Sequence, residues 1–163
     1  MRVQRVHGAK GERTRRALLD AALQVLGGEG RAALTHRRVA QEAGVSLGST
    51  TYYFASLEQL LAETLRHAVA VDVDAAEALS ARLAAAPPGS VVELVSEELA
   101  RRVTGPDRLR TAALYELHLD AVRRPDLHDA LAEWTRALLR MVAAAAPRSA
   151  AGLLAPAVTG LLL

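Results

Sequence analysis

Apolar residues recur at helical spacing along most of the chain, and glycine or proline interrupts the pattern at intervals. Such a pattern predicts a series of helices, each with one buried face. The first helix is expected from about Glu12 to Gly27, where Gly27-Gly28-Glu29-Gly30 ends it. Its predicted buried positions are Ala17, Leu18, Ala21, Ala22, Val25 and Leu26. Residues 1–11 are basic and show no periodicity, so we expect a flexible arm there.

The stretch from Thr35 to Phe54 predicts two short helices joined by a tight turn. Thr35 is a favourable N-cap, and the helix after it has a short apolar side, formed by Val39, Ala40 and Ala43. Gly44 follows where that helix should end, because glycine adopts the left-handed conformation without a steric penalty. Ser46 can cap a second helix that runs to about Phe54. The stretch therefore has the helix-turn-helix pattern.

The second of these helices has an unusual composition. Hydroxyl residues are followed by two tyrosines, and no acidic residue occurs between Gly44 and Leu57. A surface of hydroxyl and phenol groups without carboxylates suits a polyanion and the edges of bases. The alternative is a buried strand, which β-branched Thr and paired Tyr also favour. That strand would stand alone in an otherwise helical chain.

The rest of the chain predicts a long helix and then a helical body. Ser56 and Gln59 form a capping box that opens a helix from Leu57 to about Ala86, and Pro87-Pro88-Gly89 end it. This helix is long enough to link a small head to the body. Further helices are expected over residues 90–103, with a Ser90–Glu93 capping box, and over 107–123 and 125–146. A last segment, Ser149 to Leu163, is almost wholly apolar.

Composition supports helices and a reducing environment. Half of the residues are hydrophobic (51%) but only 3% are aromatic, which favours packed helices over sheets. The chain has no cysteine, which excludes disulfides and thiolate metal sites and fits a reducing cytoplasm. There is no apolar signal segment at the N-terminus, and the stretch from Ala150 to Leu163 is too short to span a bilayer. We therefore expect a soluble, cytoplasmic protein.

The net charge of +2 conceals an asymmetry between the two parts of the chain. Residues 1–54 carry nine Lys or Arg and four Asp or Glu, a balance of +5, whereas residues 55–163 carry eleven and fourteen, a balance of −3. A basic N-terminal third that coincides with a helix-turn-helix indicates a nucleic-acid-binding head on a body that does not contact phosphate. Arg2, Arg5 and Lys10 of the N-terminal arm could lie along such a nucleic acid, whereas a solvated basic tail is the plainer alternative.

The helix-turn-helix stretch and the residues on either side of it resemble, in order and spacing, the DNA-binding domain of tetracycline-repressor-type (TetR) regulators. The resemblance covers roughly residues 12–61 and rests on Val39-Ala40, Glu42-Ala43-Gly44-Val45-Ser46, Gly48-Ser49, Tyr52-Tyr53-Phe54 and Leu60-Leu61. There are two departures from the family pattern. Thr51 stands where the family usually has a phosphate-contacting tyrosine, and Leu57 stands where it often has a lysine.

The resemblance implies an all-α fold, with a three-helix head over residues 12–56 after the arm of residues 1–11. A long helix would join this head to a helical effector-binding and dimerisation body over residues 57–163. Family members usually dimerise through their last two helices, and by resemblance this chain lacks the final one. Either the sequence is a truncated version, or the helices near Leu127–Ala146 and Leu153–Leu163 form a shorter interface.

The resemblance also implies a homodimeric repressor that binds a palindromic operator in double-stranded DNA. The helix from Ser46 would enter the major groove, and Thr35, Arg37, Arg38 and arginines of the first helix would hold phosphates. The candidate DNA-binding residues are Arg13, Thr35, Arg37, Arg38, Ser46, Leu47, Gly48, Ser49, Thr51, Tyr52 and Tyr53. An ideal helical wheel instead places Leu47 on the inward face with Phe54, whereas the resemblance favours the groove.

By resemblance to the family, a small apolar effector would bind the body, and we expect no cofactor and no membrane partner. Tyr115, His118 and Trp134 are the few amphipathic side chains in an aliphatic region and could line an effector pocket. Ordinary packing of these three residues is the alternative.

No constellation of titratable residues predicts an enzyme. Glu116 and His118 are two residues apart and fall on different faces of a helix, and the sequence contains no phosphate-binding glycine loop or nucleophile elbow. A metal site from His118, His128 and Asp120 is conceivable, but the spacing does not favour it. The alternative function is an all-α protein-interaction module without DNA binding, in which the helix-turn-helix serves packing only.

Overall fold

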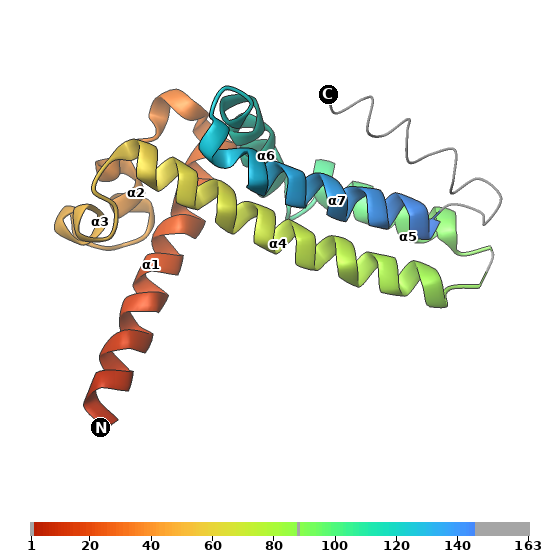
Figure 1. The fold of residues 1–163 in the computed structure, drawn as a ribbon, viewed down its shortest axis with the longest axis horizontal. Helices are drawn as coiled ribbons and strands as arrows, with labels where there is room; N and C mark the ends of the chain where they lie inside the picture. Colours follow the sequence, from red (N-terminus) through yellow and green to blue (C-terminus); the bar gives the residue numbers. More distant parts are fainter. Residues whose placement is uncertain (1, 88, 146–163) are drawn as a thin grey trace. The chain divides into compact units, whose positions relative to one another are not determined.

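The computed structural model describes residues 2–87 and 89–145, and this part of the chain is helical without any strand (Figure 1). The all-α prediction is confirmed, and the alternative of a buried strand before Phe54 is wrong. The elements are α1 (Arg2–Glu29), η1 (Arg31–Ala33), α2 (His36–Glu42), α3 (Leu47–Tyr53), α4 (Leu57–Ala85), α5 (Val91–Val103), α6 (Arg108–Ala121), η2 (Pro125–Leu127) and α7 (His128–Ala145).

These elements form two compact units. Among the described residues, the first unit contains α1 to α3, the start of α4 up to His67, and Leu109–Asp120 of α6. The second contains α4 from Ala68, α5, and the chain from Ala121 through α7. The division falls inside α4 rather than before it, and most of α6 belongs to the first unit, which differs from the expected boundary near residue 56.

Helix α1 begins at Arg2, whereas an irregular arm was expected over residues 1–11. Arginine, glutamine, lysine and alanine all favour helices, and a helix that is already nucleated gains further residues at low cost. Gly8 and Gly11 do not stop it, because a single glycine costs only about 1 kcal/mol. The buried side of α1 contains Leu18, Leu19, Ala21, Ala22, Leu23, Val25 and Leu26. Ala17, which was predicted to be buried, is exposed.

Gly27 does not end α1 but allows another helix to approach it. A Cβ atom at Gly27 would lie 1.9 Å from the carbonyl oxygen of Leu109 at the start of α6, so no other residue fits there. The helix ends two residues later, where Gly30 adopts a φ of 79° and its N–H donates to the carbonyl of Leu26. The first unit thus depends on a direct contact between α1 and α6.

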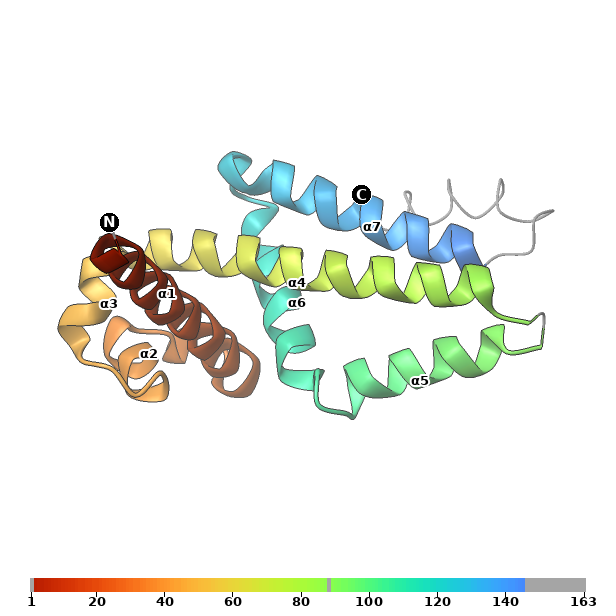
Figure 2. The ribbon, with the colours of Figure 1, turned by 90° about the horizontal axis from the view of Figure 1, so that it is seen from below.

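The core of the first unit lies where α2 packs against both α1 and α3 (Figure 2). Its fully buried side chains include Leu18, Leu26, Leu34, Val39, Phe54, Leu60 and Leu65. The predicted capping box at the start of α4 is present, because the Ser56 hydroxyl accepts a hydrogen bond from the Gln59 N–H at 3.1 Å. The Gln59 side chain also reaches back, but it accepts from the N–H of Ala55 at 2.9 Å, one residue before the cap.

In the second unit, α4 from Ala68 runs alongside both α5 and α7 (Figures 1 and 2). Its buried residues include Val69, Val73, Ala76, Leu79 and Leu83 of α4 and Leu127, Trp134 and Ala137 of the last two elements. The capping box predicted for Ser90 and Glu93 is not formed as predicted, because the Ser90 side chain makes no cap hydrogen bond. Ser90 instead has helical backbone angles and closes a turn onto the carbonyl of Pro87.

The later helices agree with the sequence pattern within a few residues. Helix α6 ends at Ala121 rather than near Arg123, and Pro125 opens the short helix η2 before α7. The apolar segment from Ser149 to Leu163, and with it the expected subunit interface near Leu153–Leu163, lies outside the described residues. Across the part of the chain that is described, no helix combines the length and the apolar character needed to cross a membrane.

Candidate nucleic-acid interface

Two side-chain caps and one glycine hold the helix-turn-helix in the predicted form. The Thr35 hydroxyl accepts a hydrogen bond from the Arg38 N–H at 3.1 Å, and the Ser46 hydroxyl accepts one from the Ser49 N–H at 3.2 Å. Gly44 between the helices has a φ of 65°, which favours glycine. Each predicted cap is confirmed.

Helix α3 presents an exposed face that contains Leu47. The Leu47 side chain is 49% exposed and that of Tyr52 is 82% exposed, whereas Thr50 and Phe54 are fully buried. The helical-wheel assignment of Leu47 to the core is therefore wrong. The wheel was anchored on Phe54, but Phe54 follows the last helical residue and has extended backbone angles, φ −133° and ψ 109°. The direction of the Phe54 side chain therefore does not show which face of α3 is buried.

The hydroxyl groups of α3 are partly used by the helix itself. The Thr51 hydroxyl donates to the carbonyl of Gly48 at 3.2 Å, which leaves only its oxygen lone pairs for another group. The hydroxyls of Ser46 and Ser49 lie 3.0 Å apart and share one hydrogen bond. The rings of Tyr52 and Tyr53 meet edge to face, with centroids 5.0 Å apart and an angle of 86° between their planes.

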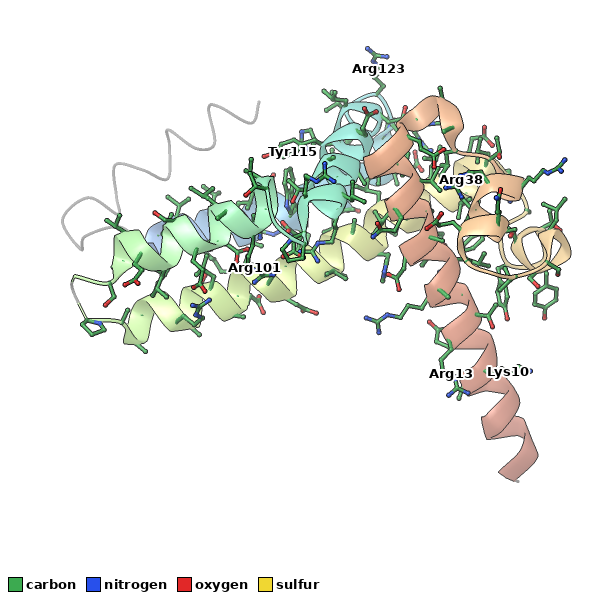
Figure 3. All side chains as sticks on the ribbon, turned by 180° about the vertical axis from the view of Figure 1, so that it is seen from behind. Lys10, Arg13, Arg38, Arg101, Tyr115 and Arg123 are labelled. Carbon is green, nitrogen blue, oxygen red and sulfur yellow. The ribbon has the colours of Figure 1, made fainter. Side chains whose placement is uncertain are left out.

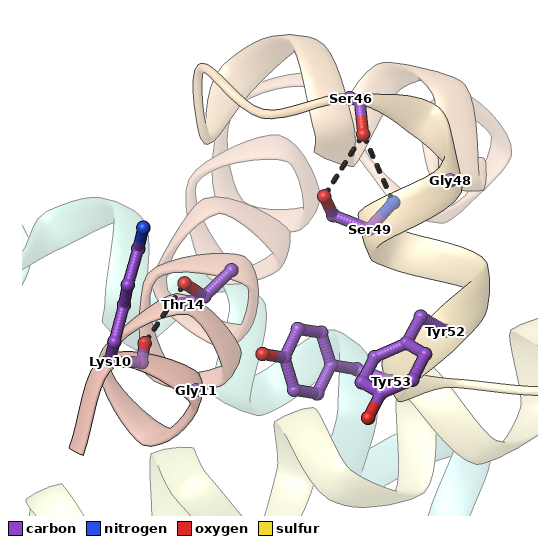
Figure 4. A pocket seen from close by; sticks show the side chains of 8 residues that line it. All are labelled: Lys10, Gly11, Thr14, Ser46, Gly48, Ser49, Tyr52 and Tyr53. Atoms are coloured by element: carbon purple, nitrogen blue, oxygen red, sulfur yellow. Dashed lines mark hydrogen bonds between the residues drawn. The ribbon is translucent and has the colours of Figure 1, made fainter. Parts of the chain in front are cut away.

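An open cleft of about 500 Å³ separates the N-terminal part of α1 from α3 (Figure 4). It is lined by Lys10, Gly11, Thr14, Ser46, Gly48, Ser49, Tyr52 and Tyr53. The sequence predicts the α3 residues in the interface and suggests Lys10 only as part of a flexible arm, but it misses Gly11 and Thr14 of α1, because residues 1–11 show no helical periodicity. The signal that could have found them is the spacing of Lys10 and Thr14, which share one side of a helix. The Thr14 hydroxyl donates to the carbonyl of Lys10 at 3.0 Å.

The predicted phosphate-contacting arginines have different surroundings. Arg37 is exposed, whereas the Arg38 guanidinium pairs with Glu29 at 2.6 Å and with Glu42 at 2.8 Å. Hydrogen bonds to Glu29 and then to Glu42 raise the pKa of Arg38 above its usual range. Two carboxylates thus accept hydrogen bonds from the Nε and Nη2 atoms of Arg38, and this side chain ties α2 to the end of α1.

The arginines of α1 also differ from the expectation. Because α1 begins at Arg2, the residues Arg13, Arg15 and Arg16 lie inside the helix and not near its start. Arg13 is exposed on α1, as Lys10 is (Figure 3). Arg15 pairs with Glu63 of α4 at 2.6 Å and lies over the ring of Phe54 at 5.9 Å, so its role is to join α1 to α4.

The three candidate effector residues belong to different units. Tyr115 is exposed and His118 is half-buried in the first unit, and burial lowers the pKa of His118. Trp134 belongs to the second unit, where it is buried and donates a hydrogen bond from its indole nitrogen to Asp72 at 2.7 Å. A shared effector pocket for these residues stays a prediction. Within residues 2–87 and 89–145, no group of three His, Asp or Glu side chains lies close enough together to hold a metal ion.

Two family models match successive parts of the chain. "Bacterial regulatory proteins, tetR family" matches residues 18–64, which include α2 and α3, and "Tetracyclin repressor-like, C-terminal domain" matches residues 86–163. The helix-turn-helix in the structure lies within the first match.

Known proteins resemble the chain in sequence and in fold. The HTH-type transcriptional regulator BetI of Rhizobium meliloti (strain 1021) is 45% identical over 74 residues, which are 45% of this chain and 36% of the relative. The multidrug binding protein EbrR in its complex with ethidium is 39% identical, with 90% of this chain and 83% of that chain covered and a TM-score of 0.60. A member of the TetR family from Streptomyces coelicolor A3 is 36% identical, with 90% and 83% covered and a TM-score of 0.58.

These similarities extend over both units and not over the helix-turn-helix alone. The chain belongs to the TetR family of bacterial regulatory proteins. This is a family of transcriptional regulators and not of enzymes. The match to BetI covers only 36% of the length of that relative.

Proposed function

We propose that the chain is a sequence-specific, DNA-binding regulator of transcription, a repressor that binds its operator as a homodimer. The observation that carries this proposal is the exposed face of α3. Leu47 and Tyr52 project from a helix whose start the Ser46 cap fixes, and no carboxylate occurs from Gly44 to Leu57. Such a face can approach the negative backbone and reach the base edges of a major groove.

Each side chain of this surface has a chemical role in the proposed complex. Leu47 contacts the methyl group of a thymine, and Ser49 and Tyr52 offer hydroxyl groups to base edges or phosphates. Arg37 and Arg13 hold phosphates, since both are exposed cations on helices of the same unit. Arg38 acts by fixing the position of α2, because Glu29 and Glu42 hold its Nε and Nη2 atoms.

Dimerisation and an effector complete the proposed mechanism. A two-fold dimer would place two α3 helices in successive major grooves, about 34–36 Å apart, and would read a palindromic operator. A small organic molecule that prefers another spacing would then release the DNA by binding one state more tightly. The similarity to EbrR, which has been crystallised with ethidium, supports an effector of this kind. A cytoplasmic site of action fits operator binding and a chain without cysteine.

The proposed DNA binding can be tested with a library of random duplexes. Purified protein would select duplexes from the library, and fluorescence anisotropy would measure the affinity for a selected duplex from about 50 to 200 mM salt. A dimer with six or more phosphate contacts should lose about a thousandfold in affinity over this range. Failure to enrich any duplex, or binding that does not depend on salt, would favour the interaction module instead.

The effector can be tested with ethidium as the probe. Ethidium is added to the protein bound to its selected duplex, and the anisotropy of the labelled duplex is followed. The anisotropy should fall if ethidium binds the protein and favours the state that is free of DNA. A duplex bound by an unrelated helix-turn-helix protein is the control, because ethidium also intercalates into DNA. If both proteins release their duplexes equally, ethidium acts through the DNA and is not an effector of this protein. The proposal of DNA binding would not be affected.

A further inference from the structure

Lys10 is the only lysine of the chain, and it lies at the cleft between α1 and α3. The side chain is exposed on the N-terminal part of α1 (Figure 3). All other Lys or Arg positions of the chain are arginines. Lysine presents a compact, mobile ammonium group, whereas arginine presents a planar fork, so the two are not equivalent toward a phosphate oxygen.

Among the residues that the structure describes, the lining of this cleft contains one cation and several hydroxyl groups but no carboxylate. Lys10 and Thr14 come from α1, and Ser49, Tyr52 and Tyr53 face them from α3 (Figure 4). An ammonium group and hydroxyl donors without a competing carboxylate match the chemistry of a phosphodiester. The volume of about 500 Å³ leaves space for a strand segment and not only for a single anion.

A glycine keeps the two walls of the cleft close together at its inner end. A Cβ atom at Gly11 would lie 3.3 Å from the hydroxyl oxygen of Tyr53, closer than most side-chain contacts. Gly11 thus lets the phenol of Tyr53 approach the backbone of α1. One residue earlier in the same helix, Lys10 has a fixed backbone position, because the helix continues through residues 2–29.

We propose that this cleft holds the sugar-phosphate backbone of an operator strand, and that Lys10 contacts one of its phosphates. The inference deepens the proposed function and rests on it. In this arrangement Lys10 supplies the cation from α1, and Tyr53 supplies a phenol from α3.

The first experiment measures how affinity depends on salt in a Lys10→Gln variant. A phosphate contact adds about 0.9 to the slope of log affinity against log salt. Loss of one contact per head should therefore lower the slope by about 0.9 per subunit. The ratio of the native affinity to the variant affinity for the duplex should therefore fall by about threefold per subunit between about 50 and 200 mM salt. Lys10→Arg should retain the slope.

Arg123→Gln is the matched control. Arg123 is an exposed cation outside the first unit, and its loss removes the same charge from the chain. Its slope should equal that of the native protein. A Lys10→Gln slope equal to that of this control would overturn the contact.

The second experiment labels the single lysine. A water-soluble reagent that acetylates amines has only Lys10 and the N-terminal amine as amine targets, and mass spectrometry of the peptide that contains Lys10 gives its rate of modification. The selected duplex should slow acetylation of Lys10 several-fold, and a non-binding duplex should not. Equal rates, or protection together with an unchanged salt slope, would show that Lys10 does not contact phosphate.

The two experiments separate this inference from the proposed function. If the native protein binds its selected duplex but Lys10 is neither protected nor needed for the salt slope, DNA binding stands and the cleft proposal is wrong. If the native protein selects no duplex, the proposed function fails and the cleft proposal fails with it.

Discussion

The indole nitrogen of Trp134 donates a hydrogen bond to the Oδ2 atom of Asp72, 2.7 Å away and 62 residues earlier in the chain. Both residues are only 3% exposed. The other carboxylate oxygen of Asp72 pairs with Arg102 at 2.8 Å, and Arg102 pairs with Glu98 at 2.7 Å. Burial alone would lower the pKa of Arg102, but Asp72 and Glu98 raise it. This network joins α4, α5 and α7 and makes Trp134 a structural residue of the second unit.

Removal of the Asp72 charge should destabilise the second unit strongly. Asp72→Ala leaves the largely buried guanidinium of Arg102 without one of its two carboxylate partners, and breaking a buried pair costs about 3–5 kcal/mol. Trp134→Phe removes one hydrogen bond to a charged group and should cost about 1.5–3 kcal/mol. Urea denaturation measures both changes. Glu77→Gln, in the exposed pair with Arg140, is the control and should change little. Similar stability for Asp72→Ala and this control would contradict the structural role.

The protein should become more stable when Thr50 is replaced by valine. Its side chain is fully buried on α3, and its hydroxyl has no hydrogen-bond partner among the described residues. Thr50→Val removes an unsatisfied polar group at nearly constant volume, so the free energy of unfolding should rise by about 1 kcal/mol. Thr64 is the matched control, because it is equally buried but its hydroxyl donates to the carbonyl of Leu60 at 2.7 Å. Thr64→Val should raise the free energy of unfolding less than Thr50→Val does, or should lower it. A larger gain for Thr64→Val would show that the unsatisfied hydroxyl of Thr50 does not cost stability.

His118 should make stability depend on pH. Burial lowers its folded pKa below the ordinary value of 6.5, so the unfolded chain binds the proton more readily. The stabilisation is therefore present above about pH 6.5 and is lost as the pH falls through the lower, folded pKa. The native protein should lose more stability than His118→Gln between about pH 7.5 and 5, as measured by chemical denaturation. Parallel pH profiles would show that His118 is not responsible.

Arg37 and Arg38 should respond differently to substitution by alanine. Arg37→Ala should leave the melting temperature unchanged and lower the salt slope of DNA binding by about 0.9 per subunit, since it removes one exposed phosphate contact. Arg38→Ala should lower the melting temperature, because Glu29 and Glu42 lose their shared partner, and should leave the slope nearly unchanged. The reverse result would restore the phosphate role that the sequence predicted for Arg38.

Leu47→Ala should affect recognition and not folding. The side chain is half exposed, so the cost of about 2–5 kcal/mol that follows truncation of a core leucine is not expected. A set of duplexes with single base changes should reveal a weaker preference for one T·A pair in each half-site. A large fall in melting temperature, with unchanged base preferences, would show that Leu47 supports the fold instead.

Local sequence was sufficient for the helix-turn-helix itself. Thr35 and Ser46 cap their helices through the residue three positions later, and Gly44 supplies the left-handed turn. These interactions span only a few residues, so the pattern of residue types determines them. The capping box at Ser56 and Gln59 could be predicted for the same reason.

Only the tertiary structure decided which side chains face solvent, which face each other and which are already paired. The exposure of Leu47 depends on the path of the chain after α3, the pairing of Arg38 depends on Glu29 from α1, and Lys10 reaches the cleft because α1 starts early. Asp72 lies 62 residues from Trp134 and 30 from Arg102, separations at which sequence periodicity carries no information. Contacts of this kind arise from packing between distant segments, and the free energy of that packing is not contained in any local pattern.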